Sequence, residues 1–140
     1  MLLWAAKKLP DLVSKRERET WVAELLALQK KDGGWALATL GKWKRGDDEK
    51  QDTETSDGYG TGFVLFALRQ AGVPATHDAL ERGVAWLRAN QRESGRWYTR
   101  SAFRDNKHFI ANAGTAMAVL ALEACGAFEP RDTRSGSAKK

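Results

Sequence analysis

Hydrophobic and charged residues alternate with a helical period in the second half of the chain. Leu80, Val84 and Leu87 recur three or four positions apart, and charged residues fill many of the positions between them. This spacing places the apolar side chains on one stripe of a helix and the charges on the opposite face. The pattern predicts an amphipathic helix over residues 77–91.

The N-terminal third of the chain has the same kind of pattern. Apolar residues at helical spacing predict a second amphipathic helix, which ends near Lys30. Ser14 is its expected N-cap, because Glu17 stands three residues later, as in a capping box. Residues 2–13 form a short apolar piece that Pro10 interrupts, and helix is expected on either side of it.

Two further stretches have no polar face. Residues 57–71 and 109–125 are apolar around most of the helical circumference, and a helix of this kind must be surrounded by protein. Glycines follow both stretches, at Gly72 and Gly126, and Pro74 comes just after the first, as helix C-termini favour. These features predict two enclosed helices.

Amphipathic and enclosed helices therefore alternate along the chain. This order is typical of two layers, with an outer layer half in contact with water and an inner layer walled in. Antiparallel helix pairs joined by turns bury a continuous core between neighbours. Since no alternating stretch is long enough for a β-sheet, the expected fold is all-α, an antiparallel αα-hairpin array.

The longest connection, residues 36–56, is polar, and connections of this length are often functional. Its acidic run from Asp47 to Glu49 is flanked by lysine and arginine residues. We interpret this alternating charge as solvated rather than as a metal site.

The turns after the two amphipathic helices repeat one another. Both contain Gln, Gly and Trp in the same order. The pairs Gln29 and Gln91, Gly33 and Gly95, and Trp35 and Trp97 are each 62 residues apart (91 − 29). A constant offset shared by three residue types indicates a repeat array.

Residues 82–97 resemble the QW motif of the squalene–hopene and oxidosqualene cyclases: a basic-Gly pair, an aromatic-aliphatic pair, Gln, and then Gly-x-Trp. The copy that ends at Trp35 matches only the second half of this motif, since Glu24 stands where an aromatic residue is expected. Residues 55–74 and 109–126 are similar to inner helices of that family's C-terminal domain. The motif positions are Gln29, Gly33, Trp35, Arg82, Gly83, Trp86, Gln91, Gly95 and Trp97.

The resemblance implies a partial α/α-toroid of about five helices over residues 1–130. In that family the Gln of the motif caps the next outer helix and the Trp packs against it, so we interpret the motif residues as structural. A complete toroid needs more hairpins than this chain shows. The alternatives are a fragment of a longer protein, an open arc, or a small bundle that closes differently. Of these we expect a fragment, whose partner is the rest of a longer chain or a second toroid domain. The basic tail, residues 131–140, is expected to be disordered.

Composition narrows the range of partners. The net charge is +5, but basic and aromatic residues do not interleave along one face, so no nucleic-acid partner is expected. A single cysteine gives no disulfide framework. No signal peptide or transmembrane segment is recognisable, and the chain is expected to be soluble or in peripheral contact with a membrane. Six tryptophans indicate dense packing or an aromatic-lined site.

Antiparallel pairing predicts where a cavity would open. Both Gly-Trp turns lead through loops to the start of an enclosed helix, so the loops and helix starts should meet at one end of the array. Asp57 and His108 are weak candidates for catalysis in this region. The residues expected to contact a ligand there are Trp43, Tyr59, Tyr98, Arg100 and Asn112.

The proton-donor motif that the resemblance would imply is missing from the sequence. Cyclases of the resembled family protonate their substrate with an Asp-x-Asp-Asp motif, which this sequence lacks. Asp57 stands at a comparable helix start, where backbone N–H groups favour the ionised carboxylate, so we interpret it as a cap rather than an acid. Cys125 and His108 would lie roughly 25 Å apart on one helix at ~1.5 Å per residue, and no metal or cofactor site is expected.

Two functions remain open. The first is a module of a squalene-cyclase-like enzyme, an isomerase by resemblance only, that shapes an apolar, aromatic-lined cavity for an isoprenoid. Aromatic faces in such a cavity would stabilise carbocations. The second is a non-catalytic toroid domain that binds a lipid, glycan or protein partner through the loops at residues 36–56 and 98–108. The basic and aromatic stretch 96–100 would suit a polar, anionic or sugar ligand.

Overall fold

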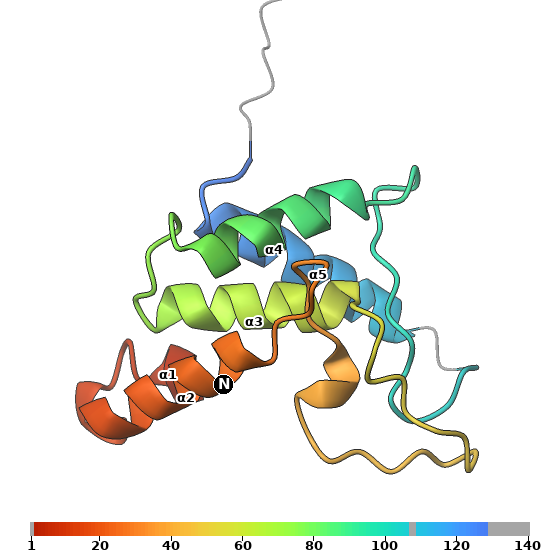
Figure 1. Ribbon diagram of the computed structural model, residues 1–140, viewed down its shortest axis with the longest axis horizontal. Coiled ribbons are helices and arrows are strands. Elements are labelled where there is room, and N and C mark those ends of the chain that lie inside the picture. Colours follow the sequence, from red (N-terminus) through yellow and green to blue (C-terminus); the bar gives the residue numbers. More distant parts are fainter. Residues whose placement is uncertain (1, 107–108, 129–140) are drawn as a thin grey trace, which may run out of the picture.

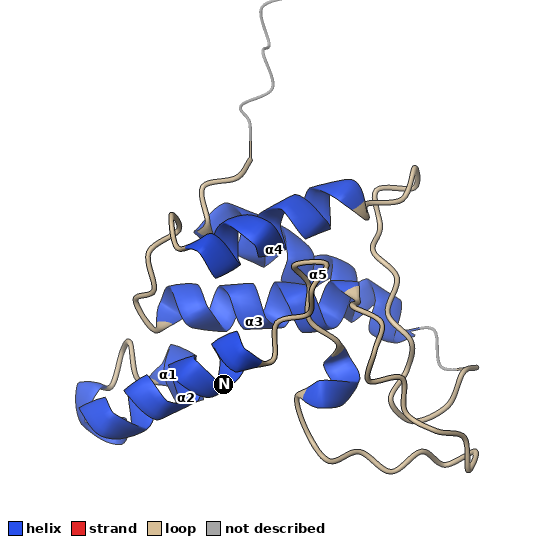
Figure 2. Cartoon of the chain, in the orientation of Figure 1, coloured by secondary structure: helices blue, strands red, loops and turns tan. Residues whose placement is uncertain are grey.

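The computed structural model describes residues 2–106 and 109–128, which form helices and loops without a strand (Figure 2). The helices are α1 (Leu2–Ala5), α2 (Lys15–Ala27), α3 (Gly58–Gln70), α4 (Asp78–Ala89) and α5 (Phe109–Ala124), with 3₁₀ turns η1 (Pro10–Leu12) and η2 (Leu37–Thr39) between them. The all-α prediction is confirmed. The expected tail at residues 131–140 and the candidate His108 lie outside the described residues.

Helix α3 is the central element (Figure 1). It contacts α1 and α2 on one side, α4 on the other, and α5 along its length. Tyr59 lies near Gly114 and Gly62 lies near Ala118, so α3 and α5 run in the same direction. The two inner helices therefore begin at the same end of the molecule.

Local sequence signals account for the helix ends. The Ser14 hydroxyl accepts from the Glu17 amide, and the Glu17 carboxylate accepts from the Ser14 amide, so the predicted capping box is present at the start of α2. Asp57 caps α3. Gly72 and Gly126 have φ of +94° and +66° after α3 and α5, a conformation that glycine adopts without a steric penalty.

The two inner helices make the same contact with the two Gln-Gly-Trp turns. The Trp35 amide donates to the Thr61 hydroxyl (3.0 Å), and the Trp97 amide donates to the Thr115 hydroxyl (3.2 Å). These threonines are 54 residues apart (115 − 61). Each hairpin thus joins its turn to its inner helix through the same contact, which supports the predicted repeat array.

The prediction that residues 109–125 are enclosed on all sides is wrong for one face of α5. Val119 and Leu120 are 41% and 42% exposed, whereas Val64 and Leu65 of α3 are fully buried. The two helices differ because α3 has neighbours on all sides, while no element among the described residues covers the far face of α5. Helix α2, also at an edge, has no fully buried residue.

Candidate functional site

The first Gln-Gly-Trp turn braces α2 against α4. The Gln29 amide donates to the carbonyl oxygens of Gly33 (2.8 Å) and Ala79 (2.7 Å) and accepts from the Arg82 guanidinium. Gly33 has φ +91° and its backbone lies against Arg82. Gln29 thus contacts the first turns of α4, the next outer helix, and its partners there are a carbonyl oxygen and a guanidinium.

The tryptophans of the two turns are buried and held in the same way. Trp35 is 0% and Trp97 is 2% exposed. The indole N–H of Trp35 donates to the carbonyl of Leu25 (2.8 Å), and that of Trp97 donates to the carbonyl of Leu87 (2.7 Å). Each indole therefore fastens its turn to the preceding outer helix.

Helix α4 supplies the other half of the first brace. A Cβ at Gly83 would lie 2.9 Å from the Trp35 ring and 2.8 Å from a Leu65 methyl, so only glycine leaves room for this contact. The Trp86 indole donates to the Asp32 carboxylate (3.0 Å). Residues 82–86 of α4 thus hold the first Gln-Gly-Trp turn, residues 29–35, in place.

The second turn lacks such an outer partner within the described residues. Gln91 is exposed, and its amide donates to the carbonyl of Gly95 (3.0 Å) in its own turn. Gly95 has φ +77°, as Gly33 does in the first turn. The turn geometry is therefore kept, but no described helix occupies the place that α4 has beside Gln29.

An apolar pocket of about 350 Å³ opens where α3 and α5 begin. Tyr59 and Phe63 stack on the α3 side of it, with ring centroids 5.9 Å apart and an angle of 11° between the rings. The pocket is lined by Leu37, Leu40, Trp43, Tyr59, Phe63, Ser101, Ala102, Phe103 and Ile110. The predicted meeting of both loops with both inner helix starts produces this concave, aromatic-rich surface.

The structure brings together only some of the residues expected to meet a ligand. Trp43 and Tyr59 line the apolar pocket. Tyr98 is exposed, with the Arg92 guanidinium 4.9 Å from its ring centroid, and it borders a second recess that adjoins the pocket. Arg100 borders the same recess, and Asn112 is exposed on α5.

Several pocket residues were not expected from the sequence. Phe63 reads as one of many apolar residues in an enclosed helix, and Phe103 as an isolated aromatic in a polar loop. Their common position follows from the contact between two loops that are distant along the chain. The clustering of aromatic residues near helix starts was the only available signal.

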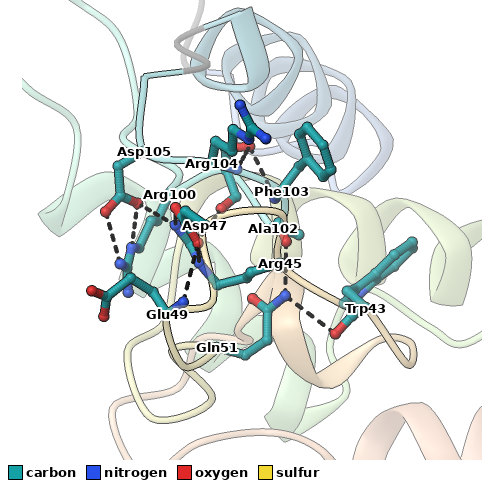
Figure 3. A network of polar contacts seen from close by, with 11 residues as sticks. Trp43, Arg45, Asp47, Glu49, Gln51, Arg100, Ala102, Phe103, Arg104 and Asp105 are labelled. Atoms are coloured by element: carbon teal, nitrogen blue, oxygen red, sulfur yellow. Dashed lines mark hydrogen bonds and ion pairs between the residues drawn. The ribbon is translucent and has the colours of Figure 1, made fainter.

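A buried arginine joins those two loops (Figure 3). Arg45 is 4% exposed, and it donates to the Ser101 carbonyl (2.7 Å), to both oxygens of the Asp47 carboxylate (2.8 and 2.5 Å) and to Asp105 (2.9 Å). Arg100 makes two further bonds to Asp105 (2.7 and 2.8 Å). Asp47, Asp48 and Glu49 are exposed, as the interpretation of this run as solvated predicts, but the flanking Arg45 is buried.

Asp57 has an enclosed, structural environment. Its carboxylate accepts from the amides of Leu37 (2.6 Å) and Gly60 (2.8 Å) and from the Thr99 hydroxyl (3.1 Å). Burial raises the pKa of Asp57 above its ordinary value, and these hydrogen bonds offset the rise only in part. The expected bias of the pKa toward the ionised form is thus reversed, although the role as helix cap is present.

The loop network makes stability depend on pH in the acidic range. The Arg100 hydrogen bonds, and then those of Arg45, hold the pKa of Asp105 well below its usual range, and Arg45 lowers the pKa of Asp47. A carboxyl with a lowered folded-state pKa stabilises the fold above its unfolded pKa, which is about 3.9, and loses that contribution as the pH falls through the folded-state pKa.

We therefore expect the free energy of unfolding to decrease as the pH is lowered below about 4. In the Asp105→Asn variant the slope of the free energy of unfolding against pH should be smaller, by an amount that corresponds to up to about one proton bound per molecule on unfolding. Urea titrations at several pH values between 5 and 2 measure both slopes. Equal slopes for the two proteins would contradict the role assigned to Asp105.

The paired helices and braced Gln-Gly-Trp turns define an α/α-hairpin repeat protein of the QW type. The squalene-hopene cyclase C-terminal domain family matches residues 11–109 and 55–139. The chain belongs to this family, whose fold is an α/α-toroid.

Curated relatives match over part of their length. The chain is 30% identical to sporulenol synthase of Bacillus subtilis over 130 residues, 86% of the chain and 19% of that protein. It is 36% identical to a squalene–hopene cyclase of Zymomonas mobilis over 73 residues and 35% identical to one of Bradyrhizobium diazoefficiens over 92 residues, or 9% and 13% of those proteins. The chain thus spans less than a fifth of the length of these relatives. No solved structure gives a significant match.

Within residues 2–106 and 109–128, no helix is both long and apolar enough to cross a bilayer. In the same part of the chain, no three His, Cys, Asp or Glu side chains are grouped so that they could hold a metal ion.

Proposed function

We propose that this chain forms part of the wall of an apolar cavity that binds an isoprenoid such as squalene, within a longer squalene-cyclase-like protein. The observation that supports this most is the pocket at the starts of α3 and α5. Its volume of about 350 Å³ is at the lower end for small-molecule sites, as expected for one part of a larger cavity.

The chemistry of the pocket favours a hydrocarbon over a polar ligand. Trp43, Tyr59, Phe63 and Phe103 present aromatic rings to it, and aromatic faces attract cationic centres such as those formed during cyclisation. In contrast, the alternative of a polar or anionic ligand at the basic loop is weakened, because Arg100 is engaged by both oxygens of Asp105.

In this proposal the chain supplies walls and braces but no proton donor. Burial raises the pKa of Asp57, but its carboxylate is occupied by the amides of Leu37 and Gly60 and by the Thr99 hydroxyl. It is also absent from the lining of the apolar pocket. The donor would belong to another part of the longer protein.

A neighbouring hairpin from that longer protein would complete the array beside α5. Support comes from the two turns: Gln29 is bonded to α4, whereas Gln91 is bonded to its own turn. The exposed Val119 and Leu120 lie on the uncovered face of α5. A further outer helix at this edge would give Gln91 and these side chains the contacts that their counterparts have.

Binding of squalene to the chain tests the proposed pocket. With squalene presented in detergent micelles, the wild-type chain should bind it, and Trp43→Ala should weaken binding roughly three- to tenfold, as expected for loss of one aromatic contact. The affinity can be measured by equilibrium partitioning of radiolabelled squalene between empty micelles and micelles that contain the chain.

The matched control is Trp4→Ala. Trp4 and Trp43 are almost equally exposed, at 48% and 47%, but Trp4 packs edge-on against Phe66 and does not line the pocket. Its removal should leave squalene binding unchanged. No binding by the wild-type chain, or equal losses for the two variants, would overturn the proposal.

A further inference from the structure

We propose that Arg45 is a positioning residue, whose guanidinium holds the two loops so that Trp43 and Phe103 form one aromatic wall of the pocket. The inference deepens the proposed function and rests on it for the meaning of that wall. The geometry of the two loops themselves does not depend on the identity of the ligand.

The guanidinium is placed at the point where the loops meet. Nε and both terminal nitrogens donate hydrogen bonds, and their acceptors are Asp47 in the same loop and Ser101 and Asp105 in the other. Asp105 is 60 residues away in the sequence. One side chain therefore donates four hydrogen bonds to three residues, in loop segments that have no helix or strand to order them (Figure 3).

The wall residues are the immediate neighbours of this junction. Trp43 lies two residues before Arg45, and Phe103 lies between Ser101 and Asp105 in the opposite loop. The Gly46 amide, next to Arg45, donates to the Phe103 carbonyl (2.9 Å). A movement of the guanidinium would thus be transmitted over one or two residues to both aromatic side chains.

A second contact, made by Gln51, also joins the two loops. The Gln51 amide donates to the Ala102 carbonyl (2.7 Å) and lies 3.4 Å from the Trp43 carbonyl. Gln51 is half-buried, but it carries no charge. Gln51 and Arg45 together hold Trp43 and Ala102, both of which line the pocket.

Arginine suits this place better than lysine. Its planar guanidinium has five N–H donors in fixed directions, so it can bond two carboxylates and a carbonyl at once, whereas an ammonium group is a compact point charge. Burial of the side chain, which is 1% exposed, shields these bonds from water. The pair of Arg100 with Asp105 is more exposed, and its arginine side chain is 33% accessible.

The test compares Arg45→Met and Arg45→Lys with Lys44→Met. Lys44 is exposed and adjacent, so its variant removes the same charge from the same loop without touching the network. Two measurements are made on the full chain: the hydrogen exchange rate of the Gly46 amide, and the affinity for squalene in micelles. Exchange at the Leu68 amide in α3 reports global unfolding.

In Arg45→Met, exchange at Gly46 should accelerate by about tenfold or more, the factor that corresponds to loss of one charge-assisted hydrogen bond, while Leu68 exchange changes far less. Squalene binding should weaken by a similar factor. In Arg45→Lys, both the Gly46 exchange rate and the squalene affinity should lie between those of Arg45→Met and the wild type. Lys44→Met should have the same Gly46 exchange rate and squalene affinity as the wild type. Ethylguanidinium should restore squalene binding to an Arg45→Ala variant.

The result that would overturn the inference is equal acceleration at Gly46 and Leu68, since that indicates only a loss of overall stability. Unchanged Gly46 exchange in Arg45→Met would also overturn it. If Arg45→Met does not fold, the same comparison is decided by Arg45→Lys. If the wild-type chain does not bind squalene but Gly46 exchange changes in the Arg45 variants as expected, the positioning role is supported and squalene is rejected as the ligand.

Discussion

Replacement of Trp35 by alanine should destabilise the chain by about 3–5 kcal/mol, the range for removal of a fully buried large aromatic side chain. Trp35 is 0% exposed, its ring and the Leu65 side chain both lie against Gly83, and its indole N–H donates to the Leu25 carbonyl. One residue therefore joins an outer helix, an inner helix and the next outer helix. Since domains are stable by only about 5–15 kcal/mol, the loss should be a large part of the total.

Chemical denaturation followed by far-UV circular dichroism measures this effect. Trp43→Ala is the control, because Trp43 is 47% exposed, and its loss should cost within about 0.5 kcal/mol, as for most surface substitutions. If Trp35→Ala does not fold, Trp35→Phe should give a smaller but measurable loss. A Trp35→Ala variant as stable as Trp43→Ala would show that the turn is not a structural brace.

The second large effect is expected at Gly62, where α3 meets α5. Gly62→Ala should destabilise the chain by about 1–3 kcal/mol through overpacking. An added Cβ would lie 2.5 Å from the Ala118 nitrogen and 2.6 Å from the Met117 carbonyl carbon, and backbone atoms cannot turn away as a flexible side chain can. Helix propensity alone predicts the opposite sign, a gain of about 1 kcal/mol.

The equivalent position in the other inner helix is a matched control. Ala116 follows Thr115 as Gly62 follows Thr61, but Ala116 is exposed. Ala116→Gly should therefore cost about 1 kcal/mol by propensity alone. Opposite substitutions at equivalent positions should thus both destabilise. A stabilising Gly62→Ala would mean that the two helices are not in close contact in solution.

Much of the fold was predictable because the relevant interactions are local. The capping box at Ser14 and the glycines at Gly72 and Gly126 act within one helical turn, so a few neighbouring residues specify them. The repeated Gln-Gly-Trp turns were visible for the same reason. The family resemblance, carried by those turns, then indicated the toroid arrangement of the helices.

The candidate site was only partly predictable. Trp43 and Tyr59 were expected to meet a ligand and both line the pocket, whereas Phe103 was not expected and Arg100 is engaged by Asp105. In a loop without regular structure, the sequence shows which side chains are available but not which of them meet. The acidic run at residues 47–49 is exposed as interpreted, but the burial of Arg45 beside it was not foreseen, because its neighbours in sequence are basic and polar.

The order of the helices, their ends and the repeated turns are determined by the sequence itself, since they depend on contacts between residues a few positions apart. The tertiary structure alone decided the burial of Arg45 between two loops, the raised pKa of Asp57 and the uncovered face of α5. Burial and electrostatic environment depend on groups brought close from distant parts of the chain. The periodicity of one segment therefore cannot predict burial or electrostatic environment that depends on those groups.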